Sequence, residues 1–283
     1  MAAYGRTDLA CEVWEQGSVN STKAEGVRVS KESLEGLELL AVHIDNRQGA
    51  LFMGKPEGSY YTLHLPDSFH PFSDEFRRCV KAVSELISPH LPQPLQSHIL
   101  IAALGNPDIT PDSVGPLTAA NVLVTRHLKE QHIEGFDGFA STILCRTGVL
   151  GTSGIESAAQ IRSFCRSFQP DLVIAVDALA GADVKRLCRS IQICDSGISP
   201  GSGVGNDREE LSRASLGVPV LALGVPTVID AAALCERDGV ERMFVTPRDI
   251  DAQVRSIGRL LGFGINMALH PGLEIEDMEL LLG

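Results

Sequence analysis

The sequence predicts an α/β fold, a three-layer sandwich in which a mostly parallel central sheet carries helices on both faces. From about residue 95 onward, apolar runs of strand length alternate with segments of helical periodicity. The runs are continuously apolar, which is typical of parallel strands covered on both sides. No internal repeat or linker divides the chain. We therefore expect a single domain, residues 1–283, with a leader and small β elaboration (1–70) and an α/β core (95–270).

The N-terminal part is expected to contain a small β-meander after a polar leader. Alternating stretches at 37–44 and 59–66 predict its strands, and the first of these is a candidate edge strand for self-association. A helix over 73–87 follows, because apolar residues recur at helical spacing from Phe76 to Ile87.

The core elements follow in order along the chain. Continuous apolar runs predict strands at 98–105, 139–146, 171–180, 190–196 and 218–225. Helical periodicity predicts helices at 116–128 and 155–168, a polar helix at 207–214 and a long helix over 247–270.

Composition narrows the class of function. The formal net charge of −12 argues against direct nucleic-acid binding, which needs clustered lysine and arginine. No apolar run approaches the roughly 20 residues that span a bilayer, and the N-terminus lacks the features of a signal peptide. The seven cysteines show no paired spacing, so we interpret them as reduced and mostly structural. A cytoplasmic protein with no membrane partner is expected.

Two aspartates occur where catalytic groups gather in open α/β sheets, beyond the carboxyl ends of strands. Asp112 lies in the loop 104–116, where Thr110 is a candidate helix N-cap followed by a proline. Asp177 follows an apolar run that predicts a buried central strand, and a carboxylate there is costly unless it is used. The alternatives are that Asp112 complements a helix dipole and that Asp177 caps the next segment.

If these aspartates lie close together, they form a water-activating pair. Two like charges a few ångströms apart cannot both ionise cheaply, so one carboxyl stays protonated. The ionised carboxylate then takes a proton from water while the protonated one polarises a peptide carbonyl. Asp112 and Asp177 are the predicted catalytic residues.

Two further loops are candidates for binding substrate. The glycine-rich loop 195–206 lacks the lysine of a phosphate-binding loop, which favours close backbone approach to a peptide or another loop over nucleotide binding. Its match to a serine-hydrolase elbow fails, because Pro200 has no N–H for an oxyanion hole. The loop 146–157 offers hydroxyls at a helix start, although capping explains them equally well. The candidate substrate-binding or site-shaping residues are Asn106, Thr152, Ser153, Asp195, Gly201, Ser202 and Gly203.

Metal and thiol chemistry have little support in the sequence. There is no HExxH motif, and of the eight histidines only His64 and His70 lie close together. No cysteine has a local signature that pairs it with a histidine. We expect no metal and no cofactor.

Read together, these loops resemble the germination protease family, and the resemblance runs along nearly the whole chain. The matching stretches are RTDLACE (6–12), GKPEGSYYTL (54–63), LGNPDITPDSVGP (104–116), GVLGTSGIE (148–156), AVDALA (175–180), IQICDSGISPGSGVGN (191–206), LGVPTVIDA (223–231), VTPRDID (245–251) and INMALHP (265–271).

This resemblance implies an endopeptidase that degrades small acid-soluble spore proteins in the germinating spore, within the spore core. It implies a fold similar to hydrogenase maturation proteases, a homo-oligomer, and catalysis by two aspartates, which fall on Asp112 and Asp177. The family is made as a zymogen, whereas only Met1 to Gly5 precede the RTDLA motif here, which leaves little propeptide to remove.

Two alternatives remain. One is an inactive relative that uses the glycine-rich cleft to hold a peptide. The other is a metal-dependent peptidase that trims a partner's C-terminus, because the hydrogenase maturation relatives hold a metal with carboxylates at corresponding strand ends.

Overall fold

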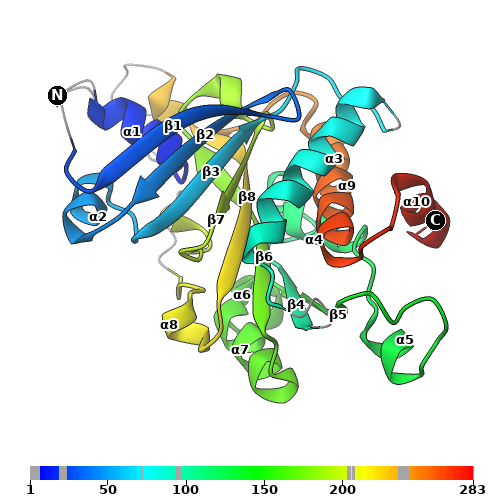
Figure 1. The fold of residues 1–283 in the computed structure, drawn as a ribbon. Helices are drawn as coiled ribbons and strands as arrows, with labels where there is room; N and C mark the ends of the chain where they lie inside the picture. The colour runs from blue at the N-terminus through cyan, green and yellow to red at the C-terminus, as the bar shows by residue number, and fades with distance from the viewer. Residues whose placement is uncertain are drawn as a thin grey trace.

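The computed structural model is built around one nine-stranded sheet with helices on both faces (Figure 1). It describes residues 7–18, 24–71, 73–93, 97–202, 205, 208–234 and 243–282. The strand order is β1-β2-β3-β7-β8-β6-β4-β5, with the short β9 paired to β8. The strands are β1 (Val27–Leu34), β2 (Leu37–Ile44), β3 (Gly58–His64), β4 (His98–Ala103), β5 (Ser141–Arg146), β6 (Leu172–Gly181), β7 (Ser190–Cys194), β8 (Val220–Asp230) and β9 (Phe244–Val245).

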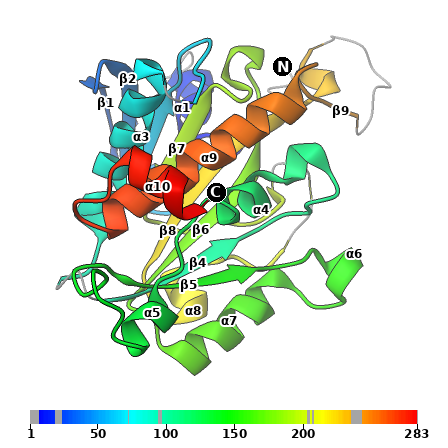
Figure 2. The same ribbon diagram turned by 90° about the vertical axis from the view of Figure 1, so that its right-hand side faces the viewer.

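The helices divide between the two faces of this sheet, as Figures 1 and 2 show. One face carries α3, α4, α9 and α10, and the other carries α1 and α2 at one end and α7 and α8 at the other. The helices are α1 (Ala10–Ser18), α2 (Arg47–Met53), α3 (Asp74–Ile87), α4 (Val114–Ala119), α5 (Arg126–Glu130), α6 (Leu150–Ser153), α7 (Ser157–Phe168), α8 (Arg213–Leu216), α9 (Ile250–Leu269) and α10 (Ile275–Leu282).

The sheet is mixed, and the prediction of a mostly parallel sheet is wrong. Only the pairs β4–β5, β4–β6 and β6–β8 are parallel, whereas the other five pairs are antiparallel. Strands β1, β2 and β3 follow one another along the chain without the long crossover that a parallel neighbour needs, and they pair in the antiparallel sense. The N-terminal meander joins the main sheet through β3 and β7. Strand β2 lies between β1 and β3, so its predicted place at an edge is also wrong.

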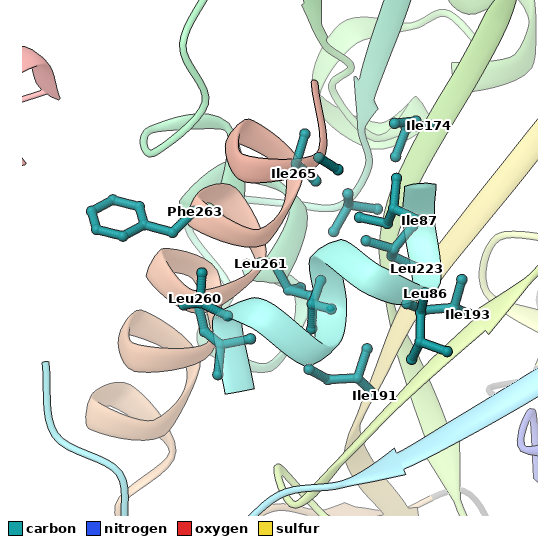
Figure 3. Packing of buried hydrophobic residues seen from close by; sticks show 14 of the residues in the cluster. Leu86, Ile87, Ile174, Ile191, Ile193, Leu223, Leu260, Leu261, Phe263 and Ile265 are labelled. Atoms are coloured by element: carbon teal, nitrogen blue, oxygen red, sulfur yellow. The ribbon is translucent and has the colours of Figure 1, made fainter. Parts of the chain in front are cut away.

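The largest core cluster lies between the sheet and the layer formed by α3 and α9 (Figure 3). Leu86 and Ile87 of α3 and Leu261 of α9 meet isoleucine and leucine side chains of β6, β7 and β8 there. The helix predicted over 73–87 is confirmed as α3, capped by the Ser73 hydroxyl, which accepts a hydrogen bond from the Phe76 N–H at 3.1 Å.

Three predicted elements differ from the structure. The helix expected at 116–128 breaks into α4 and α5, because the buried amide of Asn266 binds the intervening backbone: it accepts from Leu123 N at 2.8 Å and donates to Asn121 O at 2.9 Å. The polar helix expected at 207–214 is reduced to α8. The expected polar leader contains α1, whose first residues, Ala10 to Glu12, are buried.

The six cysteines of the described residues are free and buried, and Cys235 lies outside those residues. Among the described helices, none combines the length and apolar character needed to cross a membrane.

Candidate active site

Asp177 lies inside strand β6, within the strand predicted at 171–180, and not beyond the carboxyl end of a strand. Strand β6 continues to Gly181 because β8 extends alongside it, pairing Asp177 with Gly224 and Gly181 with Ile229. The Asp177 side chain is only 4 % exposed. The tertiary pairing therefore holds a carboxyl in the centre of the sheet, where its charged form is poorly solvated.

Asp112 is presented by a tight turn at the end of β4. It closes the short 3₁₀ helix η2 (Thr110–Asp112), and its side chain Oδ2 accepts from Asn106 N at 2.8 Å. Gly105 has φ +107°, and a Cβ there would stand 2.0 Å from the Asp112 carbonyl oxygen. Only glycine allows this approach. Thr110 is not the N-cap, which is Ile109; the Thr110 hydroxyl instead donates to Asp251 Oδ1 at 2.8 Å.

The two aspartates line one cavity of about 300 Å³. Its floor is formed by Leu104 and Gly105 after β4 and by the end of β6. Its other walls come from the glycine-rich loop, at Pro200 and Gly201, and from β8 and β9. Together the described residues make a pocket that is mostly apolar with convergent carboxyl groups, the usual character of an active site. The charged side chains lining it are Asp8, Asp112, Asp177 and Arg208.

The two aspartates differ in pKa because their surroundings differ. Burial raises the pKa of Asp177 well above its usual range, and the charge of Asp112 raises it further. Burial also raises the pKa of Asp112, but the Asn106 N–H and the Arg208 charge oppose that shift. Asp112 is therefore the group that ionises first, while Asp177 keeps its proton.

Three of the predicted site-shaping residues lie at or beside this cavity. Gly201 lines it. Ser202 lines a neighbouring cavity of about 190 Å³ and donates its hydroxyl to Asp8 Oδ1 at 2.7 Å. Asn106 is buried behind it and holds the Asp112 carboxylate through its backbone N–H.

The other predicted residues are placed elsewhere. Thr152 and Ser153 are exposed and donate their hydroxyls to Val149 O at 3.0 and 3.1 Å, so they close the turn of α6; from their loop only Ser157 reaches the cavity. Asp195 is exposed and accepts from Ser59 N at 2.8 Å, at the end of the β3–β7 pair. Gly203 lies outside the described residues.

The structure adds two charged residues that sequence reasoning missed, Asp8 and Arg208. Asp8 belongs to the matching stretch RTDLACE, but it is 169 positions from Asp177 and its stretch has no strand pattern. Arg208 stands in the segment predicted to be a solvated polar helix. Asp8 could have been found from the matching stretch RTDLACE, which contains it. Nothing in the residue pattern around Arg208 indicates that it lines a cavity.

Among the side chains that the structure describes, no group of three or more His, Cys, Asp or Glu residues is arranged to hold a metal ion.

Comparisons with known proteins agree with the resemblance seen in the sequence. The sequence profile of the germination protease family matches residues 5–243. The germination protease of Caldanaerobacter subterraneus subsp. tengcongensis is 37 % identical over 98 % of both chains. That of Clostridium tetani is 35 % identical over 96 % of this chain and 98 % of its own. That of Bacillus cytotoxicus is 39 % identical over 81 % of this chain and 64 % of its own. A match of this extent in both profile and whole-chain identity shows that the chain belongs to the germination protease family.

Proposed function

We propose that this protein is an endopeptidase that begins the degradation of small acid-soluble spore proteins in the core of the germinating spore. The observation that carries the proposal is the pair Asp112 and Asp177 on the wall of one cavity, in a chain of the germination protease family. The pair consists of one half-buried and one fully buried carboxyl, which is what water activation without a covalent intermediate requires.

In the proposed reaction Asp112 is the base and Asp177 is the acid. Ionised Asp112 accepts a proton from a water molecule as its oxygen attacks the scissile carbonyl carbon. Protonated Asp177 transfers its proton to the carbonyl oxygen, which becomes a hydroxyl of the tetrahedral intermediate. The C–N bond then breaks as the proton held by Asp112 passes to the leaving amine, and a hydroxyl of the intermediate returns a proton to Asp177 as the carbonyl re-forms.

Two features of the cavity support an extended peptide as the substrate. Along β6, Val176 and Ala180 bind partners on the β4 side, so the Ala178 carbonyl between them faces the same way. None of the described residues donates to that carbonyl, which leaves it available to a substrate N–H. At the rim, Ile109 and Phe244 expose 52 % and 37 % of their surface and offer apolar contacts to substrate side chains.

Arg208 is proposed to support the ionised state of Asp112. Its charge lowers the pKa of both aspartates. The pKa of Asp177 is nevertheless raised by the neighbouring carboxylates of Asp112 and Asp8. The same guanidinium, on the wall of the cavity, is available to stabilise negative charge that develops on the substrate oxygen.

The helices on both faces of the sheet and the carboxyl groups near the strand ends support a fold similar to that of the hydrogenase maturation proteases. The resemblance of the chain to its family supports a homo-oligomer. We propose both.

The test is incubation of the purified protein with a small acid-soluble spore protein, followed by mass spectrometry of the products. The control is the double variant Asp112→Asn, Asp177→Asn, which keeps the shape of both side chains. Internal cuts made only by the wild type are expected. Equal cutting by both proteins would move the chemistry to other residues, and substrate that is bound but never cut by either would favour a peptide-binding role.

A further inference from the structure

Strand β6 extends further than its neighbour β4 at the active-site end of the sheet. The last bond between them runs from Leu104 N to Val176 O at 2.9 Å, after which the chain of β4 turns away into the loop that carries Asp112. Strand β6 continues to Gly181. Backbone groups alternate in direction along a strand, so the groups of Ala178 and Ala180 face the place that β4 has left.

Asp8 occupies that place at Ala180. The Asp8 N–H donates to Ala180 O at 2.9 Å, as a neighbouring strand would, and the Asp8 carboxylate accepts from Ala180 N at 2.8 Å. The other carboxylate oxygen accepts the Ser202 hydroxyl at 2.7 Å. One side chain therefore joins the catalytic strand to the glycine-rich loop that forms the opposite wall of the cavity.

Asp8 is itself held firmly. Its carbonyl oxygen accepts from Lys55 Nζ at 2.8 Å and from Gln192 Nε2 at 3.1 Å. Four residues further along, the buried Glu12 carboxylate accepts from the next backbone groups of this edge, Ala182 N at 2.7 Å and Asp183 N at 3.0 Å. The N-terminal segment is thus fixed at Asp8 and again at Glu12, which holds the Asp8 carboxylate beside the cavity.

We propose that Asp8 is a positioning residue of the active site, which takes the place of strand β4 at Ala180, ties the glycine-rich loop to β6 and places a carboxylate in the cavity that holds Asp177. The proposal rests on the function proposed above, in which Asp177 acts as the acid.

The charge of Asp8 acts in the direction that this role requires. Asp8 and Asp177 line the same cavity, and the Asp8 carboxylate raises the pKa of Asp177. Removing that charge lowers the pKa of Asp177, so Asp177 loses its proton at a lower pH. The charged or titratable groups that surround Asp8 and Asp177 in the two cavities are Asp112, Arg208, Lys55, Glu210, Tyr60 and Cys194.

Three variants separate the charge of Asp8 from its hydrogen bonds. Asp8→Asn removes the charge, but the amide oxygen still accepts from Ala180 N and the amide N–H still donates to the Ser202 oxygen. Asp8→Ala removes the charge and both bonds. Ser202→Ala removes only the tie to the loop. A matched control is Asp171→Asn, at the opposite end of β6, where an exposed carboxylate accepts from His98 N at 2.8 Å.

The first measurement is the pH dependence of kcat/KM on a spore-protein substrate. For Asp8→Asn, the alkaline limb is expected to move to lower pH by roughly half a unit, with the acid limb little changed. Asp8→Ala is expected to show the same shift and a further fall of about tenfold to a hundredfold in kcat, because the loop is no longer held. Ser202→Ala is expected to lower kcat without moving the alkaline limb, and Asp171→Asn to match the wild type. An unmoved alkaline limb in Asp8→Asn overturns the proposal.

The second measurement needs no substrate. The carboxyl ¹³C signal of Asp177, identified by its loss in Asp177→Asn, is titrated in protein labelled at aspartate, with and without Asp8→Asn. A lower pKa of Asp177 in the variant supports the role of Asp8, and an equal or higher one contradicts it. If the wild type cuts no spore protein, the proposed function fails, but this titration still decides the influence of Asp8 on Asp177.

Discussion

Two fully buried titratable groups, Asp177 in strand β6 and His270 at the end of helix α9, lie in very different surroundings. Asp177 lines a cavity together with Arg208 and the carboxylates of Asp8 and Asp112. His270, which is 0 % exposed, stacks on Phe139 with ring centroids 4.7 Å apart, and burial lowers its pKa from the usual 6.5. Burial alone therefore does not indicate a catalytic group.

In both places burial removes the charge at neutral pH, but with opposite consequences. Burial raises the pKa of Asp177, so the acid is retained as a proton donor beside a second carboxyl. Burial lowers the pKa of His270 to about 4, so the ring stays neutral and packs as an aromatic side chain. The neighbours of the two groups differ: Asp177 has a cavity and a second carboxyl beside it, as the proposed reaction requires, whereas His270 has an aromatic ring and the end of a helix, which make a structural contact.

The most direct test of this difference is to substitute each residue and to measure peptide cleavage. Asp177→Asn and Asp112→Asn are each expected to lower kcat by about 10²- to 10⁴-fold, because each removes one partner of the proton transfer. His270→Gln is expected to keep cleavage near the wild-type rate at pH 7, measured below the melting temperature of the variant. Full activity in Asp177→Asn, or loss in a folded His270→Gln, would reverse the two roles.

The largest expected effect on the pH dependence of stability comes from His270. The pKa of His270 is lowered in the folded state, so the unfolded chain binds a proton at a higher pH than the folded protein does. The contribution of His270 to the free energy of unfolding is therefore fully present above about pH 6.5 and is lost as the pH falls toward about 4. The loss amounts to roughly 3 kcal/mol.

This loss is measured by urea unfolding of the wild type and His270→Gln between pH 4 and pH 7.5. The stability of the wild type relative to the variant should decline across that window. A constant difference between the two proteins would show that His270 does not titrate differently on folding.

The packing of helix α9 against the segment that follows α4 gives a smaller expected effect. Helix α9 touches the end of α4 at Gly262, where a Cβ would stand 2.5 Å from Asn121 Cβ and 2.7 Å from Asn121 O. Gly262→Ala is expected to destabilise the protein by about 1–3 kcal/mol, because the backbone of 121–123 must move.

Gly151→Ala is a matched control, since nothing lies within 4 Å of a Cβ at that position. Thermal unfolding of the two variants tests the contact. Equal melting temperatures would mean that α4 and α9 do not meet as closely as described.

The smallest expected effect is a gain in stability from Asp177→Asn. The pKa of Asp177 is raised in the folded state, so between its usual value of 3.8 and the raised value the folded protein holds a proton that the unfolded chain has lost. Wild-type stability therefore falls as pH rises through this window, opposite in sign to the effect of His270.

At pH 7 the neutral amide of Asp177→Asn is expected to be more stable than wild type by about 1 kcal/mol, with the gain shrinking below pH 4. Denaturant unfolding at pH 3.5 and pH 7 measures this difference. A variant that is less stable than wild type at both values would contradict the raised pKa.

Much of the chemistry could be predicted from the pattern of the chain. Asp112 and Asp177 stood out because each follows an apolar strand pattern, and the matching stretches include both. A hydroxyl near a helix start can bind a ligand or its own turn, and the hydroxyls of Thr152 and Ser153 both donate to Val149 O, away from the cavity. Arg208 was missed because the charged segment around it is typical of a solvated helix, and only the fold turns it toward a cavity.

The sequence by itself determined the alternation of strands and helices in the core, the two aspartates and the family, because these depend on local hydrophobic periodicity and on short motifs. The tertiary structure alone decided the antiparallel half of the sheet, the break between α4 and α5, and the position of Asp8 beside Ala180. Each of these depends on a backbone hydrogen bond to a partner far away along the chain, at Cys194, Asn266 or Asp8, and local residue patterns carry no information about such partners.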